Sequence, residues 1–262
     1  MRFEIGPRDA IARARRVCLV IPDETRRGPW RLYRDAVIRW VTDATSQAER
    51  RSILVATGVH RPVVPEDLGG LAGWSVTANG GDGYLTHREV GRTPAGTVVR
   101  LHPGYVEADA RIVLGDLSFH YFAGFGGGRK LVFPGLGEPG GILANHRLCL
   151  DARGALRPEC EPGRIDGNPV HADLVFAVSL CPPHLLIQAY EPSPGETAVL
   201  SAGDWVDVHT KGCAAYLRGH ILKHTQRPDV LIADAGGLPA RRERASGAQE
   251  PPARGALPRA GR

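Results

Sequence analysis

Short runs of β-branched and other apolar residues alternate with stretches of helical periodicity along most of the chain. This alternation predicts an α/β fold, a largely parallel sheet flanked by helices. The predicted strands cover residues 17–21, 52–56, 97–101, 111–114, 185–189 and 230–233.

Three helices are predicted between these strands, over residues 29–45, 169–180 and 205–223. In the first of them, Pro29 suits the opening turn, where its missing N–H costs nothing. The apolar residues that recur at helical spacing, and are expected to face the sheet, are Leu32, Ala36, Val37, Trp40 and Val41.

Polar clusters follow three of the predicted strands directly. They are residues 23–26 (DETR) after the first strand, residues 58–61 (GVHR) after the second, and residues 116–130 after the fourth. In open parallel sheets, ligands bind at the carboxyl ends of the strands. The clusters therefore predict a ligand site at that edge of the sheet.

The composition is that of an ordinary globular protein, with 262 residues, 42% hydrophobic and 23% charged. The formal net charge is +5, and six arginines fall within residues 240–262. Aromatic residues do not interleave with basic clusters, which speaks against a nucleic-acid partner. A basic protein that binds an anionic substrate and cofactor fits the charge equally well.

The five cysteines form no CxxC pair, which indicates a reducing compartment rather than a disulfide framework. The amino-terminal segment is charged, its following apolar run is too short for a signal peptide, and no stretch is long enough for a membrane span. We therefore expect a cytoplasmic protein without a membrane partner.

Residues 120–130, HYFAGFGGGRK, carry the densest candidate chemistry. Backbone N–H groups of such a loop can approach an anion closely, and Arg129 or Lys130 adds positive charge. The segment is neither a Walker A loop nor a dinucleotide fingerprint, because Arg129 stands where each motif needs glycine. A phosphate-binding loop and a plain glycine-rich surface turn both remain open from this segment.

His60, His120 and His146 lie beside small residues or turns rather than on an apolar helical face. Histidine is the natural acid–base group at neutral pH and a common metal ligand, so a zinc hydrolase that uses these three is one interpretation. His171 is expected to cap or pack its helix. The histidines interpreted as structural or exposed are His87, His102, His184, His209, His220 and His224.

Arg26 suits bidentate binding of a carboxylate or phosphate. A helix cap at Asp23 or Thr25 beside a surface arginine explains the same cluster equally well.

Taken in order, these segments resemble the nickel-pincer nucleotide-dependent lactate racemase family, in its amino-terminal domain. The steps of ten residues from His120 to Lys130 and of sixteen to His146 are the most specific parts, and the resemblance covers about residues 21–239. The motifs are Asp23-x-Thr25-Arg26, Gly58-x-His60-Arg61-Pro62, residues 120–130 with Pro134-Gly135, Asn145-His146 and Gly167-Asn168-Pro169-x-His171.

The resemblance implies a cofactor, the nickel complex of pyridinium-3,5-bisthiocarboxylic acid mononucleotide, here called the nickel-pincer nucleotide. Lys130 matches the lysine that is joined covalently to it, and His146 matches the histidine that completes nickel coordination. His60 and His120 match the catalytic acid–base pair that faces the substrate. The residues that match the loop holding the mononucleotide are Asp23, Glu24, Thr25 and Arg26.

The implied reaction is racemisation or epimerisation of a 2-hydroxy acid, lactate or similar. One histidine takes the hydroxyl proton, hydride leaves Cα to give a planar 2-keto acid, and hydride returns to the other face. The implied partners are the small-molecule substrate and the proteins that build the cofactor.

The chain departs from the family pattern in two places. Arg27-Gly28-Pro29-Trp30 replaces a Pro-Thr-Pro-like run, so Trp30 is expected to shape the substrate side of the pocket. Residues 1–228 are expected to form the amino-terminal domain, residues 229–239 the start of a second domain that is mostly missing, and residues 240–262 a disordered tail rich in Arg, Pro and Ala.

Two interpretations follow from the resemblance. The chain is a 2-hydroxy acid racemase, or it is a truncated, catalytically impaired module that binds the nickel-pincer nucleotide. Both interpretations require the side chains at positions 60, 120, 130 and 146 to converge in space.

Overall fold

A computed structural model describes residues 11–221 and Val230. The chain divides into two units, Met1–Leu222 and Lys223–Arg262, and the fold described here belongs to the first. Several expectations lie outside the described residues: the strand at 230–233 apart from Val230, residues 222 and 223 of the third helix, His224, the second-domain start and the tail.

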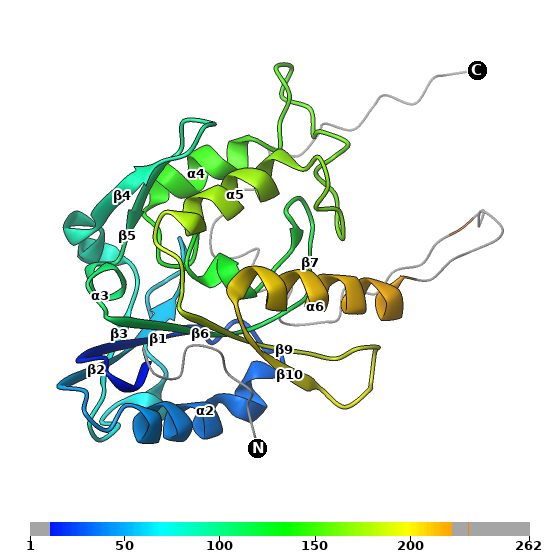
Figure 1. Cartoon of the computed structure of the whole chain (residues 1–262). Coiled ribbons are helices and arrows are strands. Elements are labelled where there is room, and N and C mark those ends of the chain that lie inside the picture. Colours follow the sequence, from blue (N-terminus) through cyan, green and yellow to red (C-terminus); the bar gives the residue numbers. More distant parts are fainter. Residues whose placement is uncertain (1–10, 222–229, 231–262) are drawn as a thin grey trace, which may run out of the picture. The chain divides into compact units, whose positions relative to one another are not determined.

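A six-stranded sheet forms the centre of the fold, with the strand order β10-β9-β6-β1-β2-β3 (Figure 1). All neighbours pair in parallel except β10, which runs antiparallel to β9. The α/β class with a largely parallel sheet is thus confirmed. The strands are β1 (Arg16–Pro22), β2 (Arg50–Ala56), β3 (Ser75–Ala78), β6 (Ala110–Asp116), β9 (Leu185–Tyr190) and β10 (Val199–Gly203).

Later strands of the sheet are added on both sides of β1. β2 and β3 follow on one side of it, whereas β6 and β9 follow on the other. The sheet therefore has a topological switch point beside β1, the place where open α/β sheets bind ligands outside the carboxyl ends of their strands. The three predicted polar clusters follow β1, β2 and β6, which are neighbours in the sheet.

Helix α2 (Trp30–Ala44) covers one face of the sheet, where Val37, Ile38 and Val41 are buried. The predicted helix is confirmed, but the prediction that Leu32 faces the sheet is wrong, since this side chain is 76% exposed. The cause is Trp30, which is buried at the start of the helix. A residue two positions further along lies roughly 200° around the helix and so points away.

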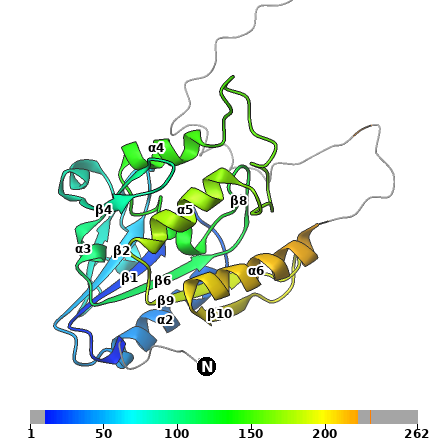
Figure 2. The ribbon, with the colours of Figure 1, turned by 45° about the horizontal axis from the view of Figure 1, so that its top comes forward.

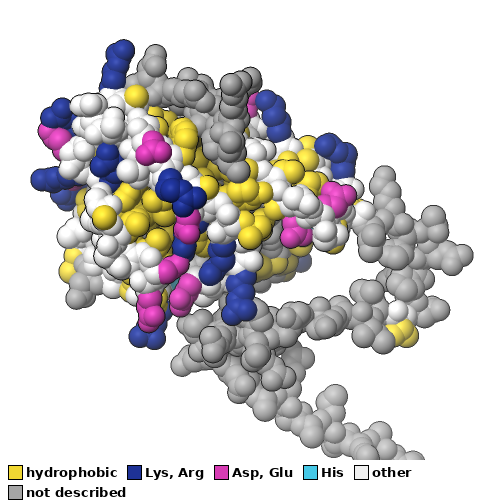
Figure 3. Space-filling model, turned by 90° about the horizontal axis from the view of Figure 1, so that it is seen from below, with side chains coloured by type: hydrophobic (Ala, Val, Ile, Leu, Met, Phe, Trp, Pro, Cys, Tyr) yellow, Lys and Arg dark blue, Asp and Glu magenta, His cyan; other side chains and the backbone are white. Residues whose placement is uncertain are grey.

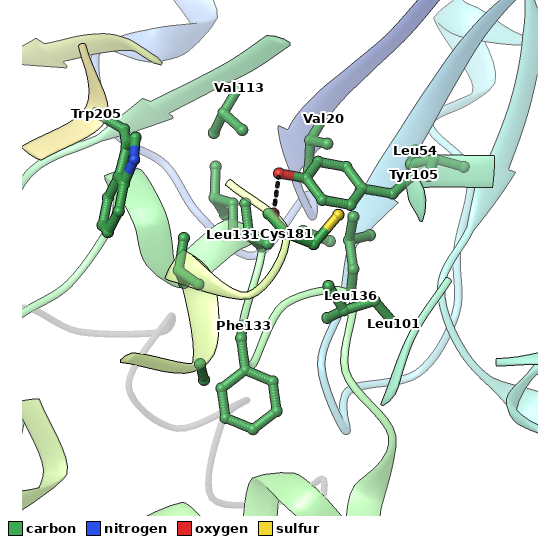
Figure 4. Close-up of a cluster of buried hydrophobic side chains, with 14 of the residues drawn as sticks. Val20, Leu54, Leu101, Tyr105, Val113, Leu131, Phe133, Leu136, Cys181 and Trp205 are labelled. Carbon is green, nitrogen blue, oxygen red and sulfur yellow. Dashed lines mark hydrogen bonds between the residues drawn. The ribbon is translucent and has the colours of Figure 1, made fainter. Parts of the chain in front are cut away.

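The other face is covered by α3 (Pro103–Val106), α4 (Pro139–Arg147), α5 (Pro169–Ser179) and α6 (Trp205–His220), as Figure 2 shows. The last two confirm predicted helices, and each begins with a side-chain cap, Asn168 and Asp204. Beneath them lies an apolar cluster in which the hydroxyl of Tyr105 donates to the carbonyl of Cys181 at 3.2 Å (Figure 4).

A separate antiparallel ribbon contains β4 (Arg88–Arg92) and β5 (Val98–Leu101). The strand predicted at residues 97–101 therefore exists, but it pairs outside the main sheet. The remaining short elements are β7 (Phe119–His120), β8 (Gly124–Phe125) and the 3₁₀ turns η1 (Glu66–Leu68), η2 (Gly81–Thr86) and η3 (Gly128–Leu131).

The face seen from below in Figure 3 mixes charged side chains with a band of hydrophobic ones. A hollow of about 260 Å³ is lined by Ile11, Ala12, Trp40 and Ala44, which carry no acid–base group. It is therefore unrelated to the predicted site. Within the described residues, no helix combines the length and the hydropathy needed to cross a bilayer.

Candidate active site

Asp23, at the end of β1, contacts a histidine that follows β2. Nδ1 of His60 donates to Oδ2 of Asp23 at 3.1 Å, and Oδ1 of Asp23 accepts the backbone N–H of Thr25 at 2.8 Å. Burial by itself raises the pKa of Asp23, but the hydrogen bonds from His60 and Thr25 and the charge of Arg26 outweigh it and lower that pKa. Asp23 is thus a carboxylate at neutral pH, and it leaves Nε2 of His60 as the nitrogen that can accept a proton.

His120, in β7, has the opposite hydrogen-bonding pattern, in which Nδ1 is an acceptor. Its Nδ1 accepts the N–H of Ala123 at 3.2 Å, so the neutral ring carries its proton on Nε2. Burial, followed by the charges of Lys130, His146 and Arg26, lowers the pKa of His120 to about 2. One histidine therefore offers a proton acceptor and the other a hydrogen-bond donor.

Three of the predicted site residues gather around the ring of Phe122. Its centroid lies 4.6 Å from the ring of His120 and 5.0 Å from the ring of His146, edge-to-face in both pairs. Nζ of Lys130 lies 5.9 Å from the same centroid. Residues from β7, η3 and α4 thus meet at one place, although 26 positions separate His120 from His146.

Lys130 is a buried amine in a positive environment. Burial, together with the charges of Arg129 and Arg26, lowers its pKa to about 7. A large share of the side chain is therefore uncharged near neutral pH, and a neutral amine is the nucleophilic form of lysine.

His146 presents an unpaired imidazole nitrogen. Its Nε2 is buried and has no hydrogen-bond partner among the described residues. Burial and the charge of Lys130 lower the pKa of His146 to about 4, so the ring is neutral. A neutral imidazole with an available nitrogen is suited to a ligand or a metal ion.

The loop after Asp23 contains the other predicted cofactor residues, Glu24, Thr25 and Arg26. It turns back on itself through a bond from the Arg26 N–H to the Asp23 carbonyl at 3.1 Å. The carbonyls of Glu24 and Arg26 accept from the Arg31 guanidinium at 2.6 and 3.2 Å. Arg26 also acts electrostatically on His120 and Lys130, which links this loop to the Phe122 group.

Trp30, the first residue of α2, holds this loop by a hydrogen bond from its indole. The side chain is 1% exposed and packs in the core on the α2 side, while its indole N–H donates to the Arg26 carbonyl at 2.9 Å. The expectation that Trp30 shapes the substrate side is therefore wrong. A large indole gains most from burial when its single N–H finds an acceptor, as it does here.

The glycine-rich loop rests directly on the end of β6. At Gly127, φ is +68°, and a Cβ atom would lie 1.4 Å from the carbonyl oxygen of Asp116. Only glycine permits both the left-handed backbone and this approach. The segment is thus a tightly seated loop rather than a plain surface turn.

The sequence did not indicate the buried pair Arg129 and His171. Arg129 is 2% exposed, and its Nη2 lies 2.7 Å from Nδ1 of His171 in the first turn of α5. Its Nε and Nη1 have no hydrogen-bond partner among the described residues. Arginine followed by lysine in a glycine-rich run favours a surface position, so the pattern gave no signal for this buried charge.

No group of three or more His, Cys, Asp or Glu side chains within the described residues is arranged to hold a metal ion. Nδ1 of His60 is also engaged in its hydrogen bond to Asp23. The three-histidine zinc site considered from the sequence is therefore not formed by the described part of the chain.

The fold and site define an α/β protein with acid–base, amine and imidazole groups at the switch point of a parallel sheet. Residues 6–156 match the model of the lactate racemase N-terminal domain. The chain belongs to this family.

Two related sequences are lactate racemases. That of Thermoanaerobacterium thermosaccharolyticum is 26% identical over 231 residues, which cover 85% of this chain and 52% of the relative. That of Lactiplantibacillus plantarum is 28% identical over 235 residues, which cover 85% and 53%. The chain thus spans about half the length of these relatives.

Two solved structures share the fold. The lactate racemase apoprotein from Thermoanaerobacterium thermosaccharolyticum superposes with a TM-score of 0.69 at 23% identity, covering 81% of this chain and 51% of that one. A protein from Thermotoga maritima gives a TM-score of 0.66 at 17% identity, covering 84% and 60%.

Proposed function

We propose that this chain takes part in the racemisation or epimerisation of a 2-hydroxy acid, lactate or similar, with the nickel-pincer nucleotide as cofactor. The observation that carries the proposal is the meeting of His120, Lys130 and His146 around Phe122, with Nε2 of His146 buried and unpartnered among the described residues. Family membership supports it.

The residues present fit this cofactor. Lys130, an amine with a pKa of about 7, suits covalent attachment to a thiocarboxyl carbon. The neutral ring of His146 suits nickel coordination, because imidazole is a good ligand for that metal. Arg26 offers a bidentate guanidinium to the mononucleotide, and Asp23, Glu24 and Thr25 complete its loop. When bound, the cofactor supplies a reversible hydride acceptor for Cα of the substrate.

The two histidines would move the protons. Nε2 of His60 takes the hydroxyl proton of one enantiomer, and the Asp23 carboxylate stabilises the imidazolium that forms. On the opposite side, His120 returns a proton to the substrate oxygen. A substrate carboxylate nearby raises the low pKa of His120, because an opposite charge favours the protonated ring. Each acid–base contribution is worth roughly 10²–10⁴-fold in rate.

Cofactor binding without turnover is the second candidate function. Each residue assigned to cofactor binding lies within the described residues, whereas the related lactate racemases are about twice as long as the matched region. In either case the partners are the proteins that build the cofactor. The five free cysteines support a reducing compartment, and we place the protein in the cytoplasm.

The test is maturation of the full chain together with the cofactor-building proteins. We expect an intact-mass increase that peptide mapping assigns to Lys130, retained nickel, and interconversion of L- and D-lactate or a close analogue by chiral chromatography. Lys130→Ala removes the adduct, whereas Lys211→Ala, a change at an exposed lysine of α6, leaves it unchanged.

The outcomes separate the candidates. An adduct with turnover establishes the racemase, and an adduct without turnover establishes the binding module. A chain that gains neither mass nor nickel under conditions that load a full-length relative would rule out both.

A further inference from the structure

Helix α2 begins without a side-chain cap of its own. Pro29 occupies the cap position and offers no hydrogen-bonding side chain to the N–H groups of the first turn. The N–H of Trp30 instead donates to Oδ1 of Asp116 at 2.6 Å, across 86 positions of sequence. A carboxylate at the end of β6 thus caps a helix that follows β1, where the helix dipole favours negative charge.

The same carboxylate lies against the backbone at Gly28. A Cβ atom at position 28 would be 1.9 Å from Oδ2 of Asp116, so a side chain here would displace the carboxylate. The backbone N–H of Gly28 also acts as a donor to this carboxylate. Asp116 is therefore fitted closely to the segment that joins the candidate cofactor loop to α2.

Trp30 continues this connection to the active site. Its backbone N–H is held by Asp116, and its indole N–H holds the carbonyl of Arg26 at 2.9 Å. The Arg26 N–H in turn donates to the carbonyl of Asp23, whose side chain accepts from His60. The hydrogen bonds thus form an unbroken path from the end of β6 to the acid–base histidine.

We propose that Asp116 and Trp30 form a clamp that positions the loop of residues 23–28 and, through Asp23, the ring of His60. Both are positioning residues. Only the acid–base role of His60 rests on the proposed function. The clamp itself restricts the motion of the loop, and it does so without cofactor or substrate.

The charge of Asp116 does not serve stability. Burial raises its pKa to about 7, and the N–H groups of Trp30 and Gly28 with the charge of Arg31 on α2 only partly offset this. The folded state therefore binds more protons than the unfolded state between the ordinary pKa of 3.8 and about 7. Across this window the free energy of unfolding falls as pH rises, and opening of the clamp becomes easier for the same reason, since it hydrates the carboxylate.

Hydrogen exchange of the apo chain tests the clamp. We expect the indole N–H of Trp30 and the backbone N–H of Thr25, corrected for intrinsic exchange, to become less protected as pH rises toward about 7, because opening of the clamp hydrates a carboxylate whose charge is disfavoured by burial. Asp116→Ala removes the acceptor and speeds both by at least about tenfold at pH 5, where the wild-type carboxyl is mostly protonated. Asp116→Asn keeps an oxygen acceptor but cannot ionise, so exchange at pH 5 stays within about threefold of the wild type and the pH step disappears.

The matched control is Asp109→Ala. Asp109 also accepts backbone N–H groups from another element, those of Arg15 and Arg16 at 3.2 and 2.8 Å, but at the opposite end of β1. We expect it to lower stability without changing exchange at Trp30 or Thr25.

Equal exchange in the Asp109 and Asp116 alanine variants would overturn the clamp. If Asp116→Ala does not fold, the asparagine variant decides alone, because a pH step that survives in it contradicts the proposal. Since no cofactor is involved, this result is independent of whether Lys130 is modified.

Discussion

At the scale of single residues, the most unusual feature is a buried guanidinium beside the candidate nucleophile. Arg129 loses its hydration, and among the described residues its guanidinium gains a hydrogen bond to His171 while its Nε and Nη1 have no hydrogen-bond partner. Burial lowers its pKa to about 10, and its charge contributes to the lowered pKa of Lys130. A buried charge so poorly paired is costly to stability, so its effect on Lys130 is the better explanation for its presence.

Replacing Arg129 with methionine should separate these two effects. Arg129→Met removes a poorly paired buried charge at similar volume, so the free energy of unfolding should stay unchanged or rise by about 1–2 kcal/mol. The pKa of Lys130 should rise above about 7, because one of the charges that lower it is gone. Urea denaturation measures the first effect, and the pH dependence of Lys130 acetylation, mapped by peptide mass, measures the second.

Lys211 is the internal reference for that acetylation, since it is exposed on α6 and far from this change in sequence. A large loss of stability in Arg129→Met would show that the guanidinium is well paired in the folded protein. An unchanged pH profile at Lys130 would show that it has no electrostatic role there.

At this scale the sequence indicated residue types better than their surroundings. Spacing and family resemblance singled out His60, His120, Lys130 and His146 as candidates, and the fold places the last three around Phe122. The burial of Trp30 and Arg129 was not predictable, because each depends on contacts with segments distant in sequence.

At the scale of elements, the glycine-rich loop packs closely against the end of β6, and the two form one rigid unit. Gly127→Ala places a methyl group 1.4 Å from the Asp116 carbonyl and also strains a left-handed backbone. We expect a loss of at least about 3 kcal/mol in the free energy of unfolding, or no folding, because backbone cannot yield as a flexible side chain can.

Gly96→Ala provides the matched comparison. Its φ is +91°, but nothing lies within 4 Å of the added Cβ, so the cost is backbone strain alone, about 1–2 kcal/mol. Chemical denaturation of both variants compares them. Equal losses would mean that the loop shifts readily and that its seat on β6 is not rigid.

Elements were predictable where pattern and packing agree. The strands β1, β2, β6 and β9 each contain at least three consecutive buried apolar residues, as expected for strands buried on both faces. Helix α4 escaped prediction because Pro139-Gly140-Gly141 at its start has low helix propensity, and packing of Ile142 into the core compensates. The pairing of β5 was not predictable, because its partner is β4, a strand whose REVGR sequence shows little apolar alternation.

At the scale of the whole described unit, two apolar clusters share the same sheet. Ile53 faces the cluster on the α2 side, and its neighbour Leu54 faces the cluster beneath α3, α4 and α5. Consecutive residues of a strand point to opposite faces, so every central strand belongs to both clusters. The clusters should therefore unfold together.

Alanine at each position tests this cooperativity. Ile53→Ala and Leu54→Ala should each lower the free energy of unfolding by about 2–5 kcal/mol while circular dichroism and fluorescence report one coincident transition. Leu32→Ala, at a side chain that is 76% exposed, should change it by less than about 0.5 kcal/mol. Separate transitions for the two core variants would mean that the faces are independent.

The switch point beside β1 also constrains when, under the proposed function, the chain could bind its cofactor during synthesis. Strand β1 leaves the ribosome early, yet its neighbour β6 and the imidazole on α4 are translated about a hundred residues later. Chains emerge at roughly 5–20 residues per second, so the nascent segment spends seconds without the other half of the candidate site. Under the proposed function, modification of Lys130 would therefore wait for a folded chain, and the cofactor-building proteins would recognise a folded surface rather than a linear peptide.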